Sequence, residues 1–173
     1  NQVERLSDHI FEKGALVIPG EIGYDLNYYA VKLSAKSNST ISNYIGVTLT
    51  GATSGVVATC VNAVATDGTD PDTLFVKYTK TGTNNTSLVF SDGETLNCTI
   101  DSAAATATVD TTATGSAAEV QQGSYYINGF LVQVSNQTLI LDKYTNTPSY
   151  RVGLTVTESF VTSSDDASLN DNA

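Results

Sequence analysis

The chain has 173 residues, with 8 lysines and arginines against 18 aspartates and glutamates, so its formal net charge is −10. This balance argues against nucleic-acid and anionic-membrane binding, because both need clustered basic residues, and the lysines here are scattered along the chain. No apolar run approaches the roughly 18 residues of a membrane span. A domain of this length buries about 70% of its unfolded surface, which is enough for one substantial core.

The N-terminal part is predicted to combine a helix with two extended segments. In "QVERLSDHIFEKG" the apolar residues recur near the helical period and Gly14 follows them, so we expect one short helix over residues 2–14. "ALVIPG" (15–20) predicts a short extended piece, and the tyrosine-rich "YDLNYYAVKLSA" (24–35) predicts a strand. The polar run "KSNSTISN" (36–43) separates this part from the next.

The middle of the chain, residues 44–100, has the pattern of a small all-β unit. Strands are predicted to recur at intervals of about ten residues, a spacing typical of a small barrel or sandwich. The expected strands are "IGVTLTG", "SGVVATCVNAVATDG", "TLFVKYTKTG", "SLVF" and "TLNCTI", with turns at "TNNT" and "SDGE".

The C-terminal part begins with a run of small residues. "DSAAATATVDTTATGSAA" (101–118) lacks bulky side chains, so we expect a linker with at most one weak edge strand. In "EVQQGSYYINGFLVQVSNQTLILDKY" (119–144), "QQG" and "SNQ" punctuate three expected strands. "YRVGLTVTESF" (150–160) alternates through its first seven positions, which predicts a strand with one buried face and one solvent-facing face.

These elements together predict a mainly β fold: an antiparallel β-sandwich or small barrel module inserted in a β-rich scaffold, with one short N-terminal helix. In the scaffold, the extended segments near the N-terminus would pair with the strand at 150–160. Shifts in composition of this kind mark domain boundaries. The expected division is a discontinuous scaffold of residues 1–43 and 116–173, an inserted module of residues 44–100, and an Ala/Thr-rich linker of residues 101–115.

No arrangement for catalysis stands out. A Ser-His-Asp triad would need His9, the single histidine, and the chain has no nucleophile elbow, P-loop or dinucleotide-binding glycine motif. Paired carboxylates hydrolyse glycosides in other proteins, but most aspartates here fall in expected turns, and no tryptophan is present to stack on a sugar. We therefore expect no enzymatic activity and no cofactor.

The two cysteines are expected to be free thiols. A pair in a chain of this length does not make a disulfide scaffold. Cys98 alternates in phase with Leu96 and Ile100, which predicts that it faces a core. A buried free thiol at Cys98 and at Cys60 is therefore favoured over a bridge between them.

Three carboxylates lie in the loop "DGTDPD" (67–72). Asp67, Asp70 and Asp72 supply the hard oxygen atoms that calcium prefers, which makes them a candidate metal site. The loop lacks the spacing and the terminal glutamate of an EF-hand. The favoured interpretation is a solvated hairpin loop, since turn aspartates usually bond their own backbone.

Four tyrosines come as two adjacent pairs, Tyr28 with Tyr29 and Tyr125 with Tyr126. Neighbouring strand residues face opposite ways, so each pair is expected to offer one ring to a core and one outward. Tyrosine is enriched at protein interfaces, which makes these four residues interface candidates. Packing within the strands explains the pairs about as well.

Several stretches resemble one family. "YYINGF", "LDKYTNTPSYRVGL" and "DDASLNDNA", within residues 123–173, are similar to a module of unknown function in structural proteins of contractile-tailed, T4-like phages of cyanobacteria. "GVTLTGATSGVVATCV", "TLFVKYTKTG" and "FSDGETL" resemble a phage tail pattern, and "LSDHIFEKGALVIPGE" resembles the segment that precedes it. In such proteins the chain continues beyond "SLNDNA", and we expect this chain to be a fragment of a longer polypeptide.

The resemblance implies a virion structural protein of the tail, baseplate or fibre-attachment region, assembled in the host cytoplasm and built mostly of β structure. It implies contacts with other tail or baseplate proteins and with other copies of the chain, for which we expect a homotrimer. It brings no catalytic residues. The alternative is a carbohydrate-binding adhesin module that docks host-surface glycans, and an enzyme ranks third.

Overall fold

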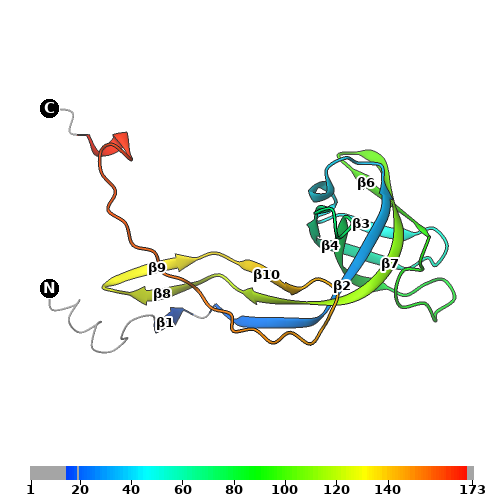
Figure 1. Ribbon diagram of the computed structural model, residues 1–173, viewed down its shortest axis with the longest axis horizontal. Helices are drawn as coiled ribbons and strands as arrows, with labels where there is room; N and C mark the ends of the chain where they lie inside the picture. Colours follow the sequence, from blue (N-terminus) through cyan, green and yellow to red (C-terminus); the bar gives the residue numbers. More distant parts are fainter. Residues whose placement is uncertain (1–14, 19, 171–173) are drawn as a thin grey trace.

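The computed structural model of the chain describes residues 15–18 and 20–170, and the helix expected over residues 2–14 lies outside this range. The described part is mainly β and contains ten strands and two short 3-10 helices (Figure 1). The strands are β1 (Ala15–Ile18), β2 (Ile22–Lys36), β3 (Thr48–Gly51), β4 (Val57–Val64), β5 (Thr73–Lys80), β6 (Thr95–Ile100), β7 (Ala103–Val120), β8 (Gly123–Ile127), β9 (Phe130–Val134) and β10 (Gln137–Asp142). The 3-10 helices are η1 (Ile41–Tyr44) and η2 (Ala167–Leu169).

Most of the strands belong to one antiparallel sheet whose pairings close on themselves. The order β10-β7-β2-β5-β4-β3-β6 is completed by a further pairing between β6 and β7. Six strands, β2 to β7, therefore form a closed cycle of hydrogen-bonded neighbours. We call these six strands the ring, which lies at the right of Figure 1. A closed cycle leaves little open strand edge for unwanted pairing.

A second region, the arm, extends away from the ring (Figure 1). The last residues of β7 leave the ring and pair with the start of β2 on one side and with β10 on the other. β8 follows directly and forms a separate sheet in the order β1-β8-β9. The arm comprises β1, β8, β9, β10 and the ends of β2 and β7 at residues 22–25 and 116–120. We call residues 143–170 the tail.

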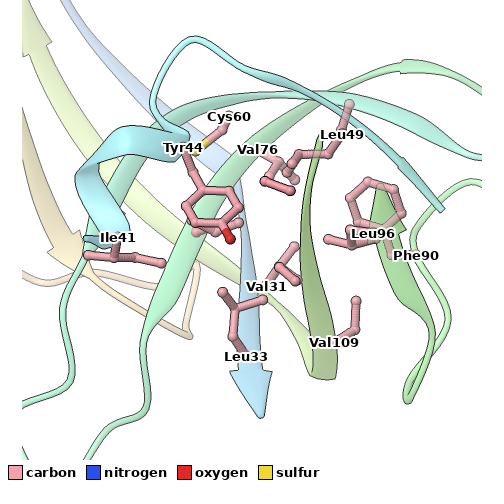
Figure 2. Close-up of a cluster of buried hydrophobic side chains, with 14 of the residues drawn as sticks. Val31, Leu33, Ile41, Tyr44, Leu49, Cys60, Val76, Phe90, Leu96 and Val109 are labelled. Atoms are coloured by element: carbon pink, nitrogen blue, oxygen red, sulfur yellow. The ribbon is translucent and has the colours of Figure 1, made fainter. Parts of the chain in front are cut away.

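The main hydrophobic core receives side chains from all six ring strands and from η1 (Figure 2). Tyr44 in η1 is fully buried, and its hydroxyl donates a hydrogen bond of 2.8 Å to the carbonyl of Thr106. The buried members of the cluster are Val31, Leu33, Ile41, Tyr44, Leu49, Val56, Ala58, Cys60, Leu74, Val76, Phe90, Leu96, Ile100, Ala105, Ala107 and Val109.

Strand β2 is buried on both faces where the ring meets the arm. Val31 and Leu33 point into the main cluster, while Tyr28 and Ala30, in the opposite phase, belong to a second cluster with Phe75. The rings of Tyr28 and Phe75 stack at 4.9 Å between centroids. Because successive side chains of a strand alternate in direction, one strand can serve two cores in this way.

A buried carboxylate joins two turns of the ring. Glu94 is 4% exposed, and its oxygens accept hydrogen bonds from the backbone N–H groups of Thr53, Ser54 and Ser91 and from the Ser54 hydroxyl, at 2.6–3.1 Å. Burial alone would raise the pKa of Glu94, but these hydrogen bonds outweigh it and lower the pKa. The charged carboxylate therefore ties the β3–β4 turn to the turn before β6.

The Ala/Thr-rich segment is not a linker. Residues 103–120 form β7, the longest strand, which pairs with β2, β6 and β10. Ala105, Ala107 and Val109 alternate into the main core, where small side chains suit the tight approach of six strands. The linker prediction for 101–115 is wrong, because small residues signal close packing here. The strand expected at "SLVF" is also missing, since residues 87–90 adopt no strand.

The expected domain boundaries are crossed by shared structure. β2 lies before residue 44 yet pairs with β5, and the main core joins Val31 and Leu33 to side chains of residues 44–100. The extended segments near the N-terminus do not pair with residues 150–160: β1 pairs with β8, and β2 with β5 and β7. Whether the middle of the chain folds as a unit separate from its flanks stays a prediction, for which a deletion is described below.

Candidate assembly surface

The end of the arm is a β-hairpin that the sequence specifies locally. β8 and β9 pair from Gly123↔Val134 to Ile127↔Phe130, and the turn residues Asn128 and Gly129 have φ angles of 47° and 94°. Two positive φ angles in succession mark a type I′ turn, for which Asn-Gly is a preferred dipeptide. The punctuation at "QQG" and "SNQ" predicts one continuous strand here. The Asn-Gly pair between two apolar runs was the signal for a hairpin.

Exposed apolar side chains gather on the arm and the tail. Phe130 at the hairpin is 72% exposed and Phe160 in the tail is 98% exposed. Monomeric proteins rarely expose large contiguous apolar patches, so a collection of this size marks an interaction surface. The exposed large apolar residues of the arm and tail are Ile22, Tyr24, Phe130, Leu131, Val132, Leu139, Tyr150, Val152, Leu154, Val156, Phe160, Val161 and Leu169.

The first half of the tail is extended but unpaired. The strand predicted over residues 150–160 does not form, and both of its faces are exposed. Two side-chain contacts hold this segment to the arm: the Tyr150 hydroxyl donates to Asp142 Oδ1 at 3.1 Å, and the Asn128 amide donates to the carboxylate of Glu158. Alternation predicts a strand only where a partner is present, and the described chain supplies none at this segment.

An open groove lies between the tail and the hairpin sheet. Its volume is about 1490 Å³. Tyr125, Ile127 and Phe130 line one side, and Leu154 and Val156 line the other. This volume exceeds the about 300–1,000 Å³ of a typical small-molecule pocket, and the walls are mainly apolar without a converging set of polar groups. The groove therefore suits a polypeptide surface better than a small ligand.

Of the four tyrosine candidates, only Tyr125 borders an open surface. Tyr28 is buried against Phe75, and Tyr29 packs against the main core with its ring edge-on to Tyr78 at 5.2 Å. Tyr126 is buried, and Tyr125 is half-buried at the groove. The two members of each pair point to opposite sides of their strand. At Tyr28 and Tyr29 both sides are covered, so the expectation of one outward ring is wrong for that pair. In the other pair Tyr126 is buried and Tyr125 borders the candidate surface, as expected of one ring in each pair.

The three loop aspartates each have a partner other than a metal. Lys143 Nζ lies 3.2 Å from Asp67 Oδ2 and 2.8 Å from Asp70 Oδ2, and Asp72 pairs with Lys36. Backbone N–H groups of Asp70 and Thr69, and then Lys143, lower the pKa of Asp67 to about 2. The described residues contain no group of three or more His, Cys, Asp or Glu that is placed to hold a metal ion. The loop fixes the start of the tail through Lys143.

The remaining candidates of the sequence lie away from this surface. Cys60 and Cys98 are both free, with Cys60 buried in the ring, and burial raises the pKa of the Cys60 thiol to about 12. His9 lies outside the described residues. Among the residues that the structure describes, no helix is long and apolar enough to cross a membrane.

Comparison with protein-family models, curated proteins and solved structures finds no match to this chain. The candidate surface therefore rests on the geometry of the arm and tail. Sequence reasoning misses its main residues, Phe130, Leu154 and Val156, because an alternating pattern indicates a buried face without showing whether the chain itself covers it. The signal that marks them is alternation in a segment for which no covering strand is left over.

Proposed function

We propose that the chain is a virion structural protein, a subunit-assembly module of a phage tail, baseplate or tail-fibre attachment region, without catalytic activity. The observation that carries this proposal is the concentration of exposed apolar side chains on an extended arm and tail, beside a ring whose own core is complete. Assembly parts need surfaces that become buried only in the complex. The resemblance of residues 123–173 to phage structural proteins supplies the particular class.

We also infer that the ring is a small antiparallel barrel. The cyclic pairing of six strands and the single cluster that collects side chains from each of them support this form over a sandwich, in which two sheets have separate edges. A closed ring is a rigid base from which an arm can project. Amide hydrogen exchange tests this form. In a barrel, the backbone amides of β3 and β6 exchange as slowly as those of β2 and β5. In a sandwich, β3 and β6 would be edge strands and their amides would exchange faster.

The location of the protein in particles tests the function. Particles of a phage whose genome encodes the chain are purified from a lysate by density gradient, and their proteins are identified by mass spectrometry. We expect peptides of this chain in the particle fraction and gold-labelled antibody on the tail in electron micrographs. Finding the chain only in the soluble fraction would contradict the proposal. Saturable binding of the purified, particle-free protein to a glycan array would favour the adhesin alternative.

A further inference from the structure

The tail carries a strand pattern but pairs with none of the described strands. Tyr150, Val152, Leu154 and Val156 share one phase and are 46–63% exposed, while Arg151, Thr155 and Thr157 occupy the other phase. β-branched and aromatic residues dominate the segment, as they do in strands. No backbone–backbone hydrogen bond links residues 143–161 to another described residue. The segment thus has the composition of a strand, while its backbone groups form no ladder with the part of the chain that the structure describes.

The arm presents the complementary feature, an open strand edge. β9 ends the order β1-β8-β9, and β10 ends the order of the larger sheet, so each has a hydrogen-bonded neighbour on one side only within the described chain. The two strands follow one another along the chain, which makes the open edge run from Phe130 to Asp142. Phe130, Val132 and Leu139 on these strands are exposed. An exposed apolar edge of this kind is a template for strand addition.

Within residues 15–18 and 20–170, the tail does not pair with this edge. Residues 153–160 lie opposite β8 and β9, but the groove of about 1490 Å³ separates the two apolar walls. The contacts that hold the segment are the side-chain hydrogen bonds of Tyr150 and Glu158. The apolar side chains of residues 153–160 and those of β8 and β9 therefore remain exposed to solvent in a single copy, although each set could bury the other.

We propose that residues 150–157 of one copy add as a β-strand to the open edge of β9 and β10 of a second copy, with Val152, Leu154 and Val156 closing the groove. A second copy is the occupant that the observations favour, because this chain supplies both the unpaired strand and the open edge. Reciprocal exchange then completes both copies at once, as in domain swapping. The inference rests on the proposed function only in that it names the surface by which subunits assemble.

The distribution of charge agrees with self-association at this surface. The chain has a net charge of −10, which opposes contact between copies at most places. Residues 121–161, by contrast, contain two acidic residues, Asp142 and Glu158, and two basic residues, Lys143 and Arg151. The strands β9 and β10 and the first half of the tail are therefore locally neutral, and two copies meet there without like-charge repulsion.

Light scattering and sedimentation of the full chain test the contact. Wild type is expected to form an assembly of defined size, and the double variant V152D/V156D to weaken its association at least tenfold. The matched control S163D/S164D adds the same charge to exposed tail residues that do not line the groove and is expected to retain the assembly. These sites are exposed, so thermal unfolding of the ring should not change. A wild-type protein that stays monomeric up to millimolar concentration, or equal loss of assembly in both variants, would overturn the proposal.

Hydrogen exchange tests the strand itself. Amides of residues 150–157 are expected to be protected in the assembly and to exchange freely in V152D/V156D. Protection that persists in a monomer would show that the segment pairs within its own chain and would overturn the proposal. An assembly without protection at 150–157 would also overturn it. Because these readouts do not involve phage particles, the protein can be present in virions while this contact fails, or absent from them while the contact holds.

Discussion

The ring and the arm are made from the same kinds of residues, but the ring covers them and the arm does not. In the ring, Val31, Leu49 and Leu96 are fully buried, and the hydrogen-bonded pairing of the six strands forms a closed cycle. In the arm and tail, Phe130, Leu154 and Phe160 have similar chemistry and remain in water. Closure of the hydrogen-bonded cycle separates the two. A closed set of strands completes its own core, while a ribbon with open edges leaves its apolar faces for another molecule.

Deletion of the middle of the chain should have the largest effect on stability, because it removes most of the ring and leaves the arm. Replacing residues 44–115 with a short Gly/Ser linker removes the ring partners of β2 on both sides, since Tyr29 pairs with Val76 and with Thr114. We expect no cooperative thermal transition. Removal of residues 149–173 is the control and should leave the transition in place. A cooperative transition in the deleted protein would instead support the discontinuous scaffold and would show that the arm folds without the ring.

Substitution within the ring core should give the next largest effect. Phe90 is 2% exposed and its ring lies edge-on to Tyr78 at 5.2 Å. Phe90→Ala is expected to lower the free energy of unfolding by about 3–5 kcal/mol, because the lost contacts leave a cavity. Leu88→Ala, in the same loop but 65% exposed, should change it by less than about 0.5 kcal/mol. Equal effects of the two variants in urea unfolding would mean that this side of the ring is not closed.

Loss of the buried carboxylate should have a smaller effect on stability, and this effect should depend on pH. In Glu94→Gln one oxygen that accepts two hydrogen bonds becomes an amide donor facing those same donors, at an expected cost of about 2–3 kcal/mol near pH 7. The folded pKa of Glu94 is lowered, so its contribution is present above the unfolded value of about 4.3 and is lost as the pH falls through the folded pKa.

Urea titrations of Glu94→Gln and wild type at several pH values measure this difference. The gap between the two proteins should be constant from pH 7 to about pH 5 and should close below pH 4. Asp92→Asn, at an exposed position in the same turn, is the control and should leave stability nearly unchanged. A gap that widens toward low pH would contradict the assignment of a charged, hydrogen-bonded Glu94.

The junction of ring and arm should respond more mildly. A Cβ atom at Gly115 would lie 2.6 Å from the Lys143 carbonyl oxygen and 2.8 Å from that of Asp142, so the end of β10 would have to shift. Gly115→Ala is expected to cost about 1 kcal/mol, the lower end of the range for overpacking, because the start of the tail can move. Gly153→Ala, which has open space around it, serves as the control. A neutral Gly115→Ala would indicate that β10 does not press on β7.

Local alternation predicted the strands whose burial is decided by close neighbours. In β5, Leu74 and Val76 face the main core as their phase indicated, and in β6 Leu96 and Ile100 do the same. β7 was missed because its inward residues are mainly alanines, whose burial depends on how near the other strands come and not on the residues themselves. The strand prediction for residues 150–160 is wrong for the opposite reason. The alternating pattern there is strong, but a strand also needs a second segment to pair with.

The candidate surface was predictable only in part. The Asn-Gly turn between β8 and β9 is written in two adjacent residues, and the apolar character of Phe130 and Val156 is visible directly. Which apolar segments stay uncovered depends on the long-range order of strands, which no short window contains. The tyrosine pairs show the same limit. Their opposite orientations followed from strand geometry, but Phe75 covers Tyr28 from a strand far along the chain.

The passage of β2 and β7 through both regions has a mechanical consequence. Domains that swing against each other are joined by exposed linkers with few contacts. Here two long antiparallel strands, paired from Ile22↔Val120 to Lys36↔Ala107, run from the arm into the ring (Figure 1). A load applied at the hairpin tip is therefore carried into the ring along paired strands, whose register shifts between Asp25 and Tyr28, where the arm part of β2 ends. We therefore expect the ring and the arm to move together, because paired strands and not an exposed linker join them.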